Sequence, residues 1–318
     1  MDQVSIAKKK MKYTAPVGYW QRYVVFLKYG TLKKHFNFLL SLINWKLGKS
    51  HLKTMPSFLK VEITRECNVG CKLCLVEKPS WHYSLNNYRQ LVDKLKNHIY
   101  LVSLYDIGEP LENKEVIAFI QYAKQNKLGS IISTSLSIKK SDEFWEAFVL
   151  SGLDKLIVAI DGITAEVYNT YRTNGDLSLI LENLKKILYY KEMHHIQMYI
   201  EWQMIDFKWN LHEQKSAREM AYQMGCSNFR LIREAVKPRL RYKKENIIRR
   251  RNCMLPYIIF IVTADNKVRP CYKVYNEPVE IGDLSKNSFE EIWNGDEVFR
   301  IRDKNRICDR TGCKTCQE

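Results

Sequence analysis

Three cysteines in the first quarter of the chain have a spacing that suits a metal cluster. Cys67, Cys71 and Cys74 follow the pattern C-x3-C-x2-C, directly after the apolar run 58–64. Three thiolates on one tight loop can hold three irons of a cubane cluster and leave the fourth iron open for chemistry. Because cluster loops usually supply four cysteines, a loop with three predicts a reactive centre. A zinc site, or a disulfide pair with one spare thiol, is the alternative interpretation of the same loop.

The remaining cysteines and the N-terminus bear on the cellular compartment. The nine cysteines are odd in number and cluster at short spacings, as metal ligands do in cytosolic proteins. The first residues, Met1-Asp2-Gln3, lack the charged and apolar regions of a secretory signal. We therefore expect a cytoplasmic protein with metal-binding cysteines, not a secreted disulfide framework.

The elements that must position the cysteine loop alternate between strands and helices. Apolar runs predict strands over 58–64, 100–107, 129–134, 155–161, 196–205 and 228–233, with amphipathic helices over 84–98, 113–127, 141–151, 164–190 and 211–224. Repeated βα units predict an α/β fold with a parallel sheet, here a partial (β/α)6 barrel. Active-site groups of such barrels lie at the carboxyl ends of the strands, where the cysteine loop also falls.

Four domains or segments are expected along the chain. Residues 1–56 form a basic helical extension, whose periodicity from Val17 to Trp45 is broken at Gly30, and residues 57–233 form the partial barrel. Residues 234–252 are a basic linker. Residues 253–318 form a small cysteine-rich domain with a β-hairpin (strand 256–262, return 268–271) and a helix over 288–300.

The formal charge of +16 is concentrated in two segments. Residues 1–60 contain 12 Lys and Arg against Asp2 alone, and residues 230–251 contain 10 against Glu234 and Glu245. Each segment favours an anionic partner, such as nucleic acid, a lipid headgroup, a phosphorylated substrate or an acidic peptide, or is simply solvated surface. A basic amphipathic helix pair within residues 1–50 allows a peripheral membrane contact, whereas packing against the protein body is the simpler expectation.

The ordered motifs resemble the radical SAM superfamily. Cys67-x3-Cys71-x2-Cys74 resembles its cluster loop, and Ile107-Gly108-Glu109-Pro110 resembles its Gly-Gly-Glu-Pro motif, with Ile107 in place of the first glycine. Ser133-Thr134-Ser135 resembles its ribose-contacting segment. Ile160-Asp161-Gly162, followed by Tyr171-Arg172, resembles a stretch found in members with a C-terminal cysteine domain.

The C-terminal part is similar to the SPASM or shorter twitch extension of that superfamily. The similarity rests on Cys253-x2-Pro256, Pro270-Cys271, the segments 281–284 and 290–294, and the closing cysteines. The five cysteines are too few for two clusters with four ligands each, so one auxiliary [4Fe–4S] cluster is expected. Its ligands would be Cys253, Cys271, Cys313 and Cys316, with Cys308 as the spare or the substitute.

The resemblance implies an enzyme with a [4Fe–4S] cluster on Cys67, Cys71 and Cys74, which are the catalytic ligands, and S-adenosylmethionine (SAM) as cofactor. It implies reductive cleavage of SAM to a 5′-deoxyadenosyl radical that abstracts hydrogen from a substrate, with flavodoxin or ferredoxin as an external one-electron donor. Glu109 would accept a hydrogen bond from the methionine ammonium. Asp161 would contact cofactor or substrate, or cap the helix that follows it. The expected cofactor-binding residues are Leu73, Gly108, Glu109, Pro110, Thr134, Ser135 and Asp161.

Three functions remain to be compared. The two basic segments favour oxidation, epimerisation or dehydration of a small anionic, sugar or lipid-linked molecule. The SPASM-like part also suits modification of a ribosomal peptide or a protein side chain. A zinc-containing nucleic-acid-binding protein would leave Gly108-Glu109-Pro110 and Thr134-Ser135 unexplained, so no nucleic-acid partner is expected.

Overall fold

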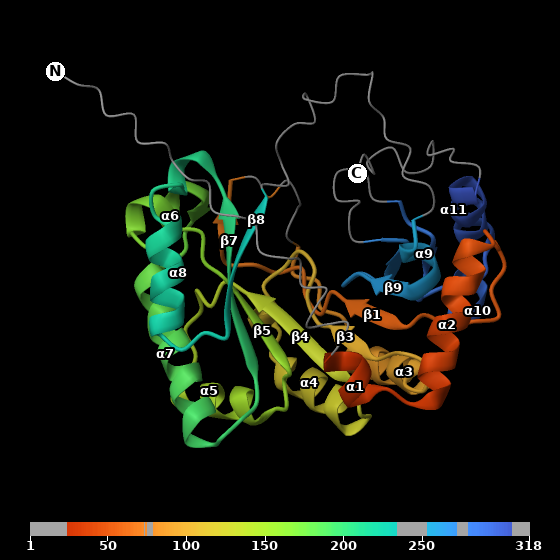
Figure 1. The fold of residues 1–318 in the computed structure, drawn as a ribbon, viewed down its shortest axis with the longest axis horizontal. Coiled ribbons are helices and arrows are strands. Elements are labelled where there is room, and N and C mark those ends of the chain that lie inside the picture. Colours follow the sequence, from red (N-terminus) through yellow and green to blue (C-terminus); the bar gives the residue numbers. More distant parts are fainter. Residues whose placement is uncertain (1–23, 73, 75–78, 234–252, 272–278, 307–318) are drawn as a thin grey trace.

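The structure of the protein is a computed structural model, which describes residues 24–72, 74, 79–233, 253–271 and 279–306 (Figure 1). Several sequence predictions lie outside the described residues. They concern Leu73, the linker 234–252, and Cys308, Cys313 and Cys316.

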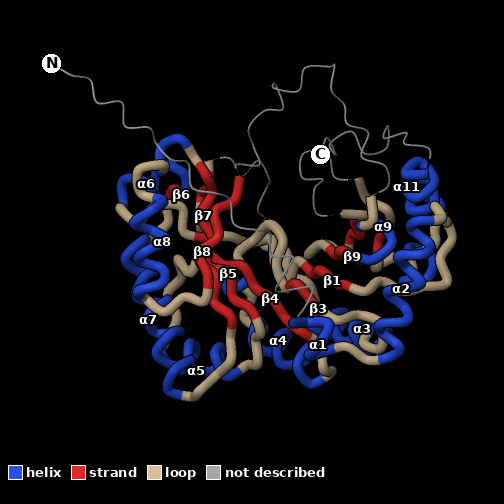
Figure 2. The backbone as a smooth tube through the Cα atoms, in the orientation of Figure 1, coloured by secondary structure: helices blue, strands red, loops and turns tan. Residues whose placement is uncertain are grey.

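A curved sheet of nine strands forms the centre of the molecule, and helices cover its outer face (Figures 1 and 2). The strand order is β11-β10-β9-β1-β3-β4-β5-β7-β8; all pairs from β9 to β8 are parallel, and β9, β10 and β11 pair in antiparallel fashion. The described strands leave the sheet open, which confirms the α/β partial barrel. The strands are β1 (Phe58–Val61), β3 (Leu101–Ser103), β4 (Gly129–Thr134), β5 (Lys155–Ala159), β7 (Tyr199–Asp206), β8 (Asn228–Arg233), β9 (Ile259–Val262), β10 (Lys267–Arg269) and β11 (Gly282–Asp283).

The helices largely follow the predicted order. They are α1 (Val25–Tyr29), α2 (Leu32–Lys46), α3 (Leu85–Leu95), α4 (Val116–Gln125), α5 (Asp142–Leu150), α6 (Ala165–Tyr171), α7 (Leu177–Met193), α8 (Gln214–Gln223), α9 (Leu255–Ile258), α10 (Phe289–Trp293) and α11 (Asp296–Arg306). Ser84, Ser141, Thr164 and Asp176 start α3, α5, α6 and α7, because each side chain accepts a hydrogen bond from a backbone N–H of the first turn. The predicted break at Gly30 is confirmed, and the stretch predicted as a helix over 164–190 is divided near Gly175 into α6 and α7.

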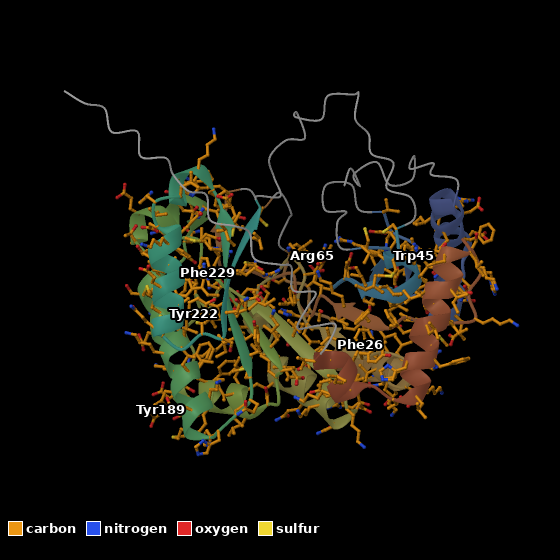
Figure 3. All side chains as sticks on the ribbon, in the orientation of Figure 1. Phe26, Trp45, Arg65, Tyr189, Tyr222 and Phe229 are labelled. Atoms are coloured by element: carbon orange, nitrogen blue, oxygen red, sulfur yellow. The ribbon has the colours of Figure 1, made fainter. Side chains whose placement is uncertain are left out.

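Alternation along the strands separates two environments. Val102, Ile132, Val158 and Trp202 pack under the outer helices in the main apolar core. The labelled side chains in Figure 3 show the same division, with Phe229 inside and Tyr189 on the outer surface. Residues one position away point to the inner face of the sheet, which becomes the floor of the site described below.

The N-terminal helices cover the opposite end of the sheet from the cysteine loop. Val25 and Tyr29 of α1 pack against Leu101 and Ile131, which belong to β3 and β4. Phe26, labelled in Figure 3, stacks edge-on to Tyr100 with ring centroids 4.4 Å apart. The described part of the first basic segment therefore packs against the protein body at the amino ends of the strands.

The C-terminal hairpin extends the same sheet. β9 pairs in parallel with β1, from Phe58 opposite Ile259 to Val61 opposite Val262. The predicted strand over 256–262 is partly wrong, because Leu255–Ile258 is the helical turn α9; Pro256 sits in its first turn, where proline is tolerated. The domain boundaries at residues 56, 233 and 252 stay predictions.

Candidate active site

A two-stranded sheet that the sequence analysis missed anchors the cysteine loop. β2 (Gly70–Cys71) pairs with β6 (Arg172–Thr173), and the backbone N–H of Lys72 donates to the carbonyl of Tyr171 at 3.0 Å. A Cβ on Gly70 would lie 2.7 Å from the hydroxyl of Thr173, so the close approach requires glycine. The loop is thus fixed to the turn that follows α6.

The three thiols of the loop lie on this anchored segment, and each is partly exposed. The N–H of Cys74 donates to the carbonyl of Cys71 at 3.0 Å, so these two cysteines share one tight turn. A guanidinium nitrogen of Arg172 lies 3.9 Å from the sulfur of Cys71. Within the described ranges, no three His, Cys, Asp or Glu side chains converge as metal ligands. The donor set itself, three thiols beside a half-buried cation, fits an anionic iron–sulfur cluster.

Glu109 joins the ends of two neighbouring strands. It follows β3 and is 3 % exposed, and its carboxylate accepts from the hydroxyl of Thr134 at 2.6 Å and from both the N–H and the hydroxyl of Ser135 at 2.8 Å. The N–H of Leu111 is a fourth donor, at 3.2 Å. The structure therefore brings together three residues that the sequence placed at successive strand ends.

The buried carboxylate of Glu109 has no cationic partner in the described part of the chain. Other buried carboxylates there do have one: Glu62 pairs with Arg65, Asp154 with Lys28, Asp161 with Arg172, Glu201 with Lys155, and Asp283 with Lys267. Glu213 lacks one too, but its carboxylate accepts from the N–H of Ile163 at 2.6 Å and from the hydroxyl of Thr164 at 2.5 Å at the start of α6, where the helix dipole favours a negative charge. Burying a charge without a counter-ion is costly, so Glu109 marks a site for a cation.

The neighbours of Glu109 fix its backbone against the cysteine loop. A Cβ on Gly108 would lie 2.3 Å from the carbonyl of Thr64, so this glycine permits close contact with the loop backbone. The N–H of Glu109 donates to the carbonyl of Glu66 at 2.8 Å, and Pro110 opens the short 3-10 helix η2 (Pro110–Glu112).

Further contacts hold the loop and the turn after β4 in place. The side-chain amide of Asn68 donates to the carbonyl of Ser137, and Asn183 donates to the carbonyls of Leu136 and Ile138 at 2.9 and 2.8 Å. Arg65, labelled near the centre of Figure 3, forms an ion pair with Glu62 at 2.7 Å. These contacts tie the cysteine loop to β1 and β4.

Asp161 binds Arg172 and does not cap a helix. One carboxylate oxygen lies 2.6 Å from the Nε of Arg172, and the other accepts from the N–H of Ile205 at 2.7 Å. Thr164 is the N-cap of α6, so the capping role expected as an alternative is wrong. Burial by itself would lower the pKa of Arg172, but Asp161 and then Cys71 raise it above its usual value. Arg172 is therefore a permanent cation beside the cysteine loop.

Two residues of the site were not predicted. Arg172 was part of the quoted Tyr171-Arg172 pair, so its signal was visible, but nothing in the sequence showed its pairing with Asp161. Tyr168 is fully buried, and its hydroxyl has no hydrogen-bond partner among the residues that the structure describes. Burial, followed by smaller charge effects of residues that include Asp161 and Cys71, raises its pKa. A buried phenol without a partner next to these groups is a polar atom available to a bound molecule.

Only part of the predicted auxiliary site is described. Cys253 precedes α9, and Cys271, which is buried, follows β10. Asn294 holds this region to the segment before β1: its side chain accepts from the N–H of Leu52 at 2.9 Å and donates to the carbonyl of Leu52 at 2.8 Å. The ligand set itself stays a prediction.

Comparison with known proteins gives both a family match and relatives. The SPASM family, an iron–sulfur cluster-binding domain, matches residues 253–317. A GTP 3′,8-cyclase of Alkaliphilus metalliredigens is 29 % identical over 42 % of this chain, and the match spans only 43 % of that enzyme. An AdoMet-dependent heme synthase of Methanosarcina barkeri is 21 % identical, over 81 % of this chain and 88 % of the relative.

Solved structures show the same fold. SuiB of Streptococcus suis bound to S-adenosylmethionine matches with a TM-score of 0.59 and 11 % identity, over 78 % of this chain and 68 % of SuiB. SuiB bound to the precursor peptide SuiA gives 0.57 at 13 % identity, over 86 % and 73 %. BtrN in complex with AdoMet and 2-DOIA gives 0.52 at 17 % identity, over 84 % and 94 %. At these identities the likeness concerns the fold alone.

The ordered motifs, the matching domain and the relatives together define an iron–sulfur protein that uses SAM. These findings support a radical SAM enzyme with a C-terminal SPASM domain, the superfamily that the ordered motifs resemble. The cofactors of this class are a [4Fe–4S] cluster, an auxiliary iron–sulfur cluster and S-adenosylmethionine.

Proposed function

We propose that the protein is a radical SAM enzyme that abstracts hydrogen from an anionic small molecule, a sugar or a lipid-linked molecule. The observation that carries the proposal is the buried carboxylate of Glu109, which four neutral donors surround but no described cation pairs with. The ammonium of methionine is the cation that this carboxylate would receive.

Each residue of the site has a role in this proposal. Cys67, Cys71 and Cys74 hold the cluster, which supplies the electron for cleaving SAM. The carboxylate of Glu109 is already saturated, so an arriving ammonium replaces one hydroxyl donor. That hydroxyl, on Thr134 or Ser135, then becomes available to a ribose. Gly108 and Pro110 shape the backbone around Glu109, and Leu73 would pack on adenine.

Arg172 and Asp161 act as positioning residues. The guanidinium of Arg172 offsets negative charge at Cys71, and Asp161 fixes its orientation. Cys253, Cys271, Cys313 and Cys316, with Cys308 as the alternative, hold the auxiliary cluster. A flavodoxin or ferredoxin delivers the electron.

Cations on the inner face of the sheet support an anionic substrate. Lys60 and Arg230 point to this face, since their strand neighbours lie in the helix-covered core. Arg269 lies nearby on β10, and its Nε has no hydrogen-bond partner in the described residues although the side chain is buried. Each of the three cations already pairs with a carboxylate, Lys60 and Arg269 with Asp106 and Arg230 with Glu201, so an anionic substrate would share them with these carboxylates. Apart from Lys60, the described part of the first basic segment does not contribute, because α1 and α2 lie away from the carboxyl ends of the strands. BtrN, whose chain the match spans almost fully, is solved with 2-DOIA.

Modification of a peptide or protein side chain is the second candidate. It is supported by the fold likeness to SuiB, which is solved with its precursor peptide SuiA. The match covers 73 % of the SuiB chain, whereas the match to BtrN covers 94 % of the BtrN chain.

Iron and sulfide analysis of the anaerobically purified protein tests the cluster assignment. We expect about eight irons in the wild type and about four in the variant Cys67→Ala/Cys71→Ala/Cys74→Ala. Cys226→Ala is the matched control, because Cys226 is buried in the main core, away from both cysteine groups. A colourless protein that contains zinc and no iron would refute the proposal.

The substrate class is tested by turnover. Cleavage of SAM that is stimulated by anionic small molecules, with a substrate affinity that falls as salt rises, supports the first candidate. Stimulation only by a peptide supports the second candidate and rejects the first.

A further inference from the structure

Helix α2 packs against the protein with its polar side. Lys34, Asn37 and Ser41 are buried, and they share one face of the helix. The side-chain amide of Asn37 exchanges two hydrogen bonds of 3.0 Å with the backbone of Met55. The ammonium of Lys34 donates to the carbonyl of Tyr29 at 3.1 Å. The contact with the body combines these hydrogen bonds with the packing of two partly buried aromatic side chains, Phe38 and Trp45.

The opposite face of α2 is apolar and exposed. We call Leu32, Phe36, Leu39, Ile43 and Leu47 the α2 stripe; they recur every three or four residues and are between 43 and 90 % exposed. A surface helix of a globular protein normally turns such a stripe toward the core. In α2 the stripe faces away from the core. We therefore expect the α2 stripe to contact a second apolar surface outside the described part of the protein.

The charges around the α2 stripe have one sign. Lys33 and Lys46 are exposed and flank the stripe on its two sides, and Lys49 and Lys53 follow it. There is no Asp or Glu between Gln3 and Val61. Cations on both sides of an apolar stripe suit a lipid surface, because their aliphatic stems lie along the apolar layer while the ammonium groups reach anionic headgroups.

We propose that α2 docks on an anionic lipid membrane through the α2 stripe, with Lys33 and Lys46 at the headgroups. No helix of the described residues combines the length and apolarity needed to cross a bilayer. The helix therefore lies in the plane of the interface, with its apolar side inserted. The proposal does not depend on the substrate or on the clusters.

Sedimentation with lipid vesicles tests this docking. We expect the full chain to sediment with phosphatidylcholine vesicles that contain phosphatidylglycerol, and to remain in solution with phosphatidylcholine alone. Phe36→Ser/Ile43→Ser should abolish most of the binding. Lys33→Gln/Lys46→Gln should weaken it by about fivefold for each lysine, and added salt should weaken it further.

Matched substitutions elsewhere control for surface chemistry. Leu150→Ser removes an exposed apolar side chain on α5, and Lys215→Gln removes an exposed cation on α8; both should bind vesicles as the wild type does. Circular dichroism checks that every variant is folded. Absence of wild-type binding, or equal binding by the wild type and both α2 variants, would overturn the proposal. So would a wild-type dimer that Phe36→Ser/Ile43→Ser converts to monomers without any vesicle binding, since a second copy would then cover the stripe.

Discussion

The two ends of the sheet each contain a buried carboxylate that holds neighbouring strands together, but only one of them is neutralised. At the amino ends, Asp154 accepts from the hydroxyl of Tyr29 at 2.5 Å and the N–H of Ser130 at 3.0 Å, and it pairs with Lys28 at 2.6 Å. At the carboxyl ends, Glu109 receives comparable neutral donors and no described cation. The same local chemistry therefore stabilises the fold at one end and prepares a binding site at the other.

Two cations differ between the ends of the sheet in the opposite way to these carboxylates, because the one at the carboxyl ends has an anionic partner and the one at the amino ends does not. Arg172, beside the cysteine loop, has Asp161 as its partner. Lys34, at the amino ends, is bound by carbonyl oxygens, and burial lowers its pKa from 10.5 to about 8. Among the described residues, Glu109 at the carboxyl ends is thus an anion without a cationic partner, and Lys34 at the amino ends is a cation without an anionic partner. Substitutions can show separately what each end of the sheet contributes to SAM binding and to stability.

The largest effect is expected for Glu109→Gln. Loss of a charge-assisted hydrogen bond in a buried site should weaken SAM binding by about 100-fold, and the amide oxygen of glutamine remains an acceptor for only one of the two pairs of neutral donors. Equilibrium binding of SAM to the reconstituted protein measures it. Glu115→Gln, which changes an exposed carboxylate nearby, should bind normally. If Glu109→Gln bound SAM with undiminished affinity, the carboxylate of Glu109 would not be part of the SAM site, and the two ends of the sheet would not differ in function.

A smaller effect, on stability only, is expected for Asp154→Asn. Weakening its hydrogen bonds to Tyr29, Ser130 and Lys28 should lower the free energy of unfolding by about 1–3 kcal/mol. The affinity for SAM should not change, because Asp154 lies at the far end of the strands. Urea unfolding, compared with the exposed-pair variant Asp142→Asn, measures the difference. A loss of SAM affinity with normal stability would contradict a purely structural role.

The last prediction concerns Lys34 and the pH dependence of the free energy of unfolding. Between about pH 8 and pH 10.5 the unfolded chain keeps a proton on this lysine that the folded chain has released. Stability therefore rises with pH across this window relative to Lys34→Met, by up to about 3 kcal/mol over the whole window. The difference between the urea midpoints of the two proteins at several pH values gives this change. A constant difference would mean that Lys34 keeps its proton when buried.

Local patterns in the sequence predicted most elements that position the site. The limits of β4 and β8 were correct, and Glu109, Thr134 and Ser135 meet as expected because parallel strands end at one edge. Non-local contacts were not predictable. The pairing of β2 with β6 involves two residues on each strand, too few to show a periodicity. The close approach of Gly108 to the carbonyl of Thr64 joins two segments that lie far apart in the sequence.

Periodicity also could not show which side of a helix faces the protein. The apolar spacing of α2 correctly predicted a helix, but the usual rule would have buried Phe36 and Ile43. Instead, Asn37 and Ser41 are buried, because the backbone near Met55 supplies hydrogen-bond partners for Asn37. Which face of α2 is buried thus depends on the contact between α2 and the segment around Met55, and neither sequence shows it alone.

The pairing of β9 with β1 has a consequence for how the chain is made. During synthesis, β1 emerges long before Ile259–Val262 can add beside it, so one edge of this strand stays unpaired while the half-barrel assembles. Such late, distant pairing slows folding. The cysteine loop that follows β1 therefore reaches its final surroundings only after the C-terminal hairpin has been translated.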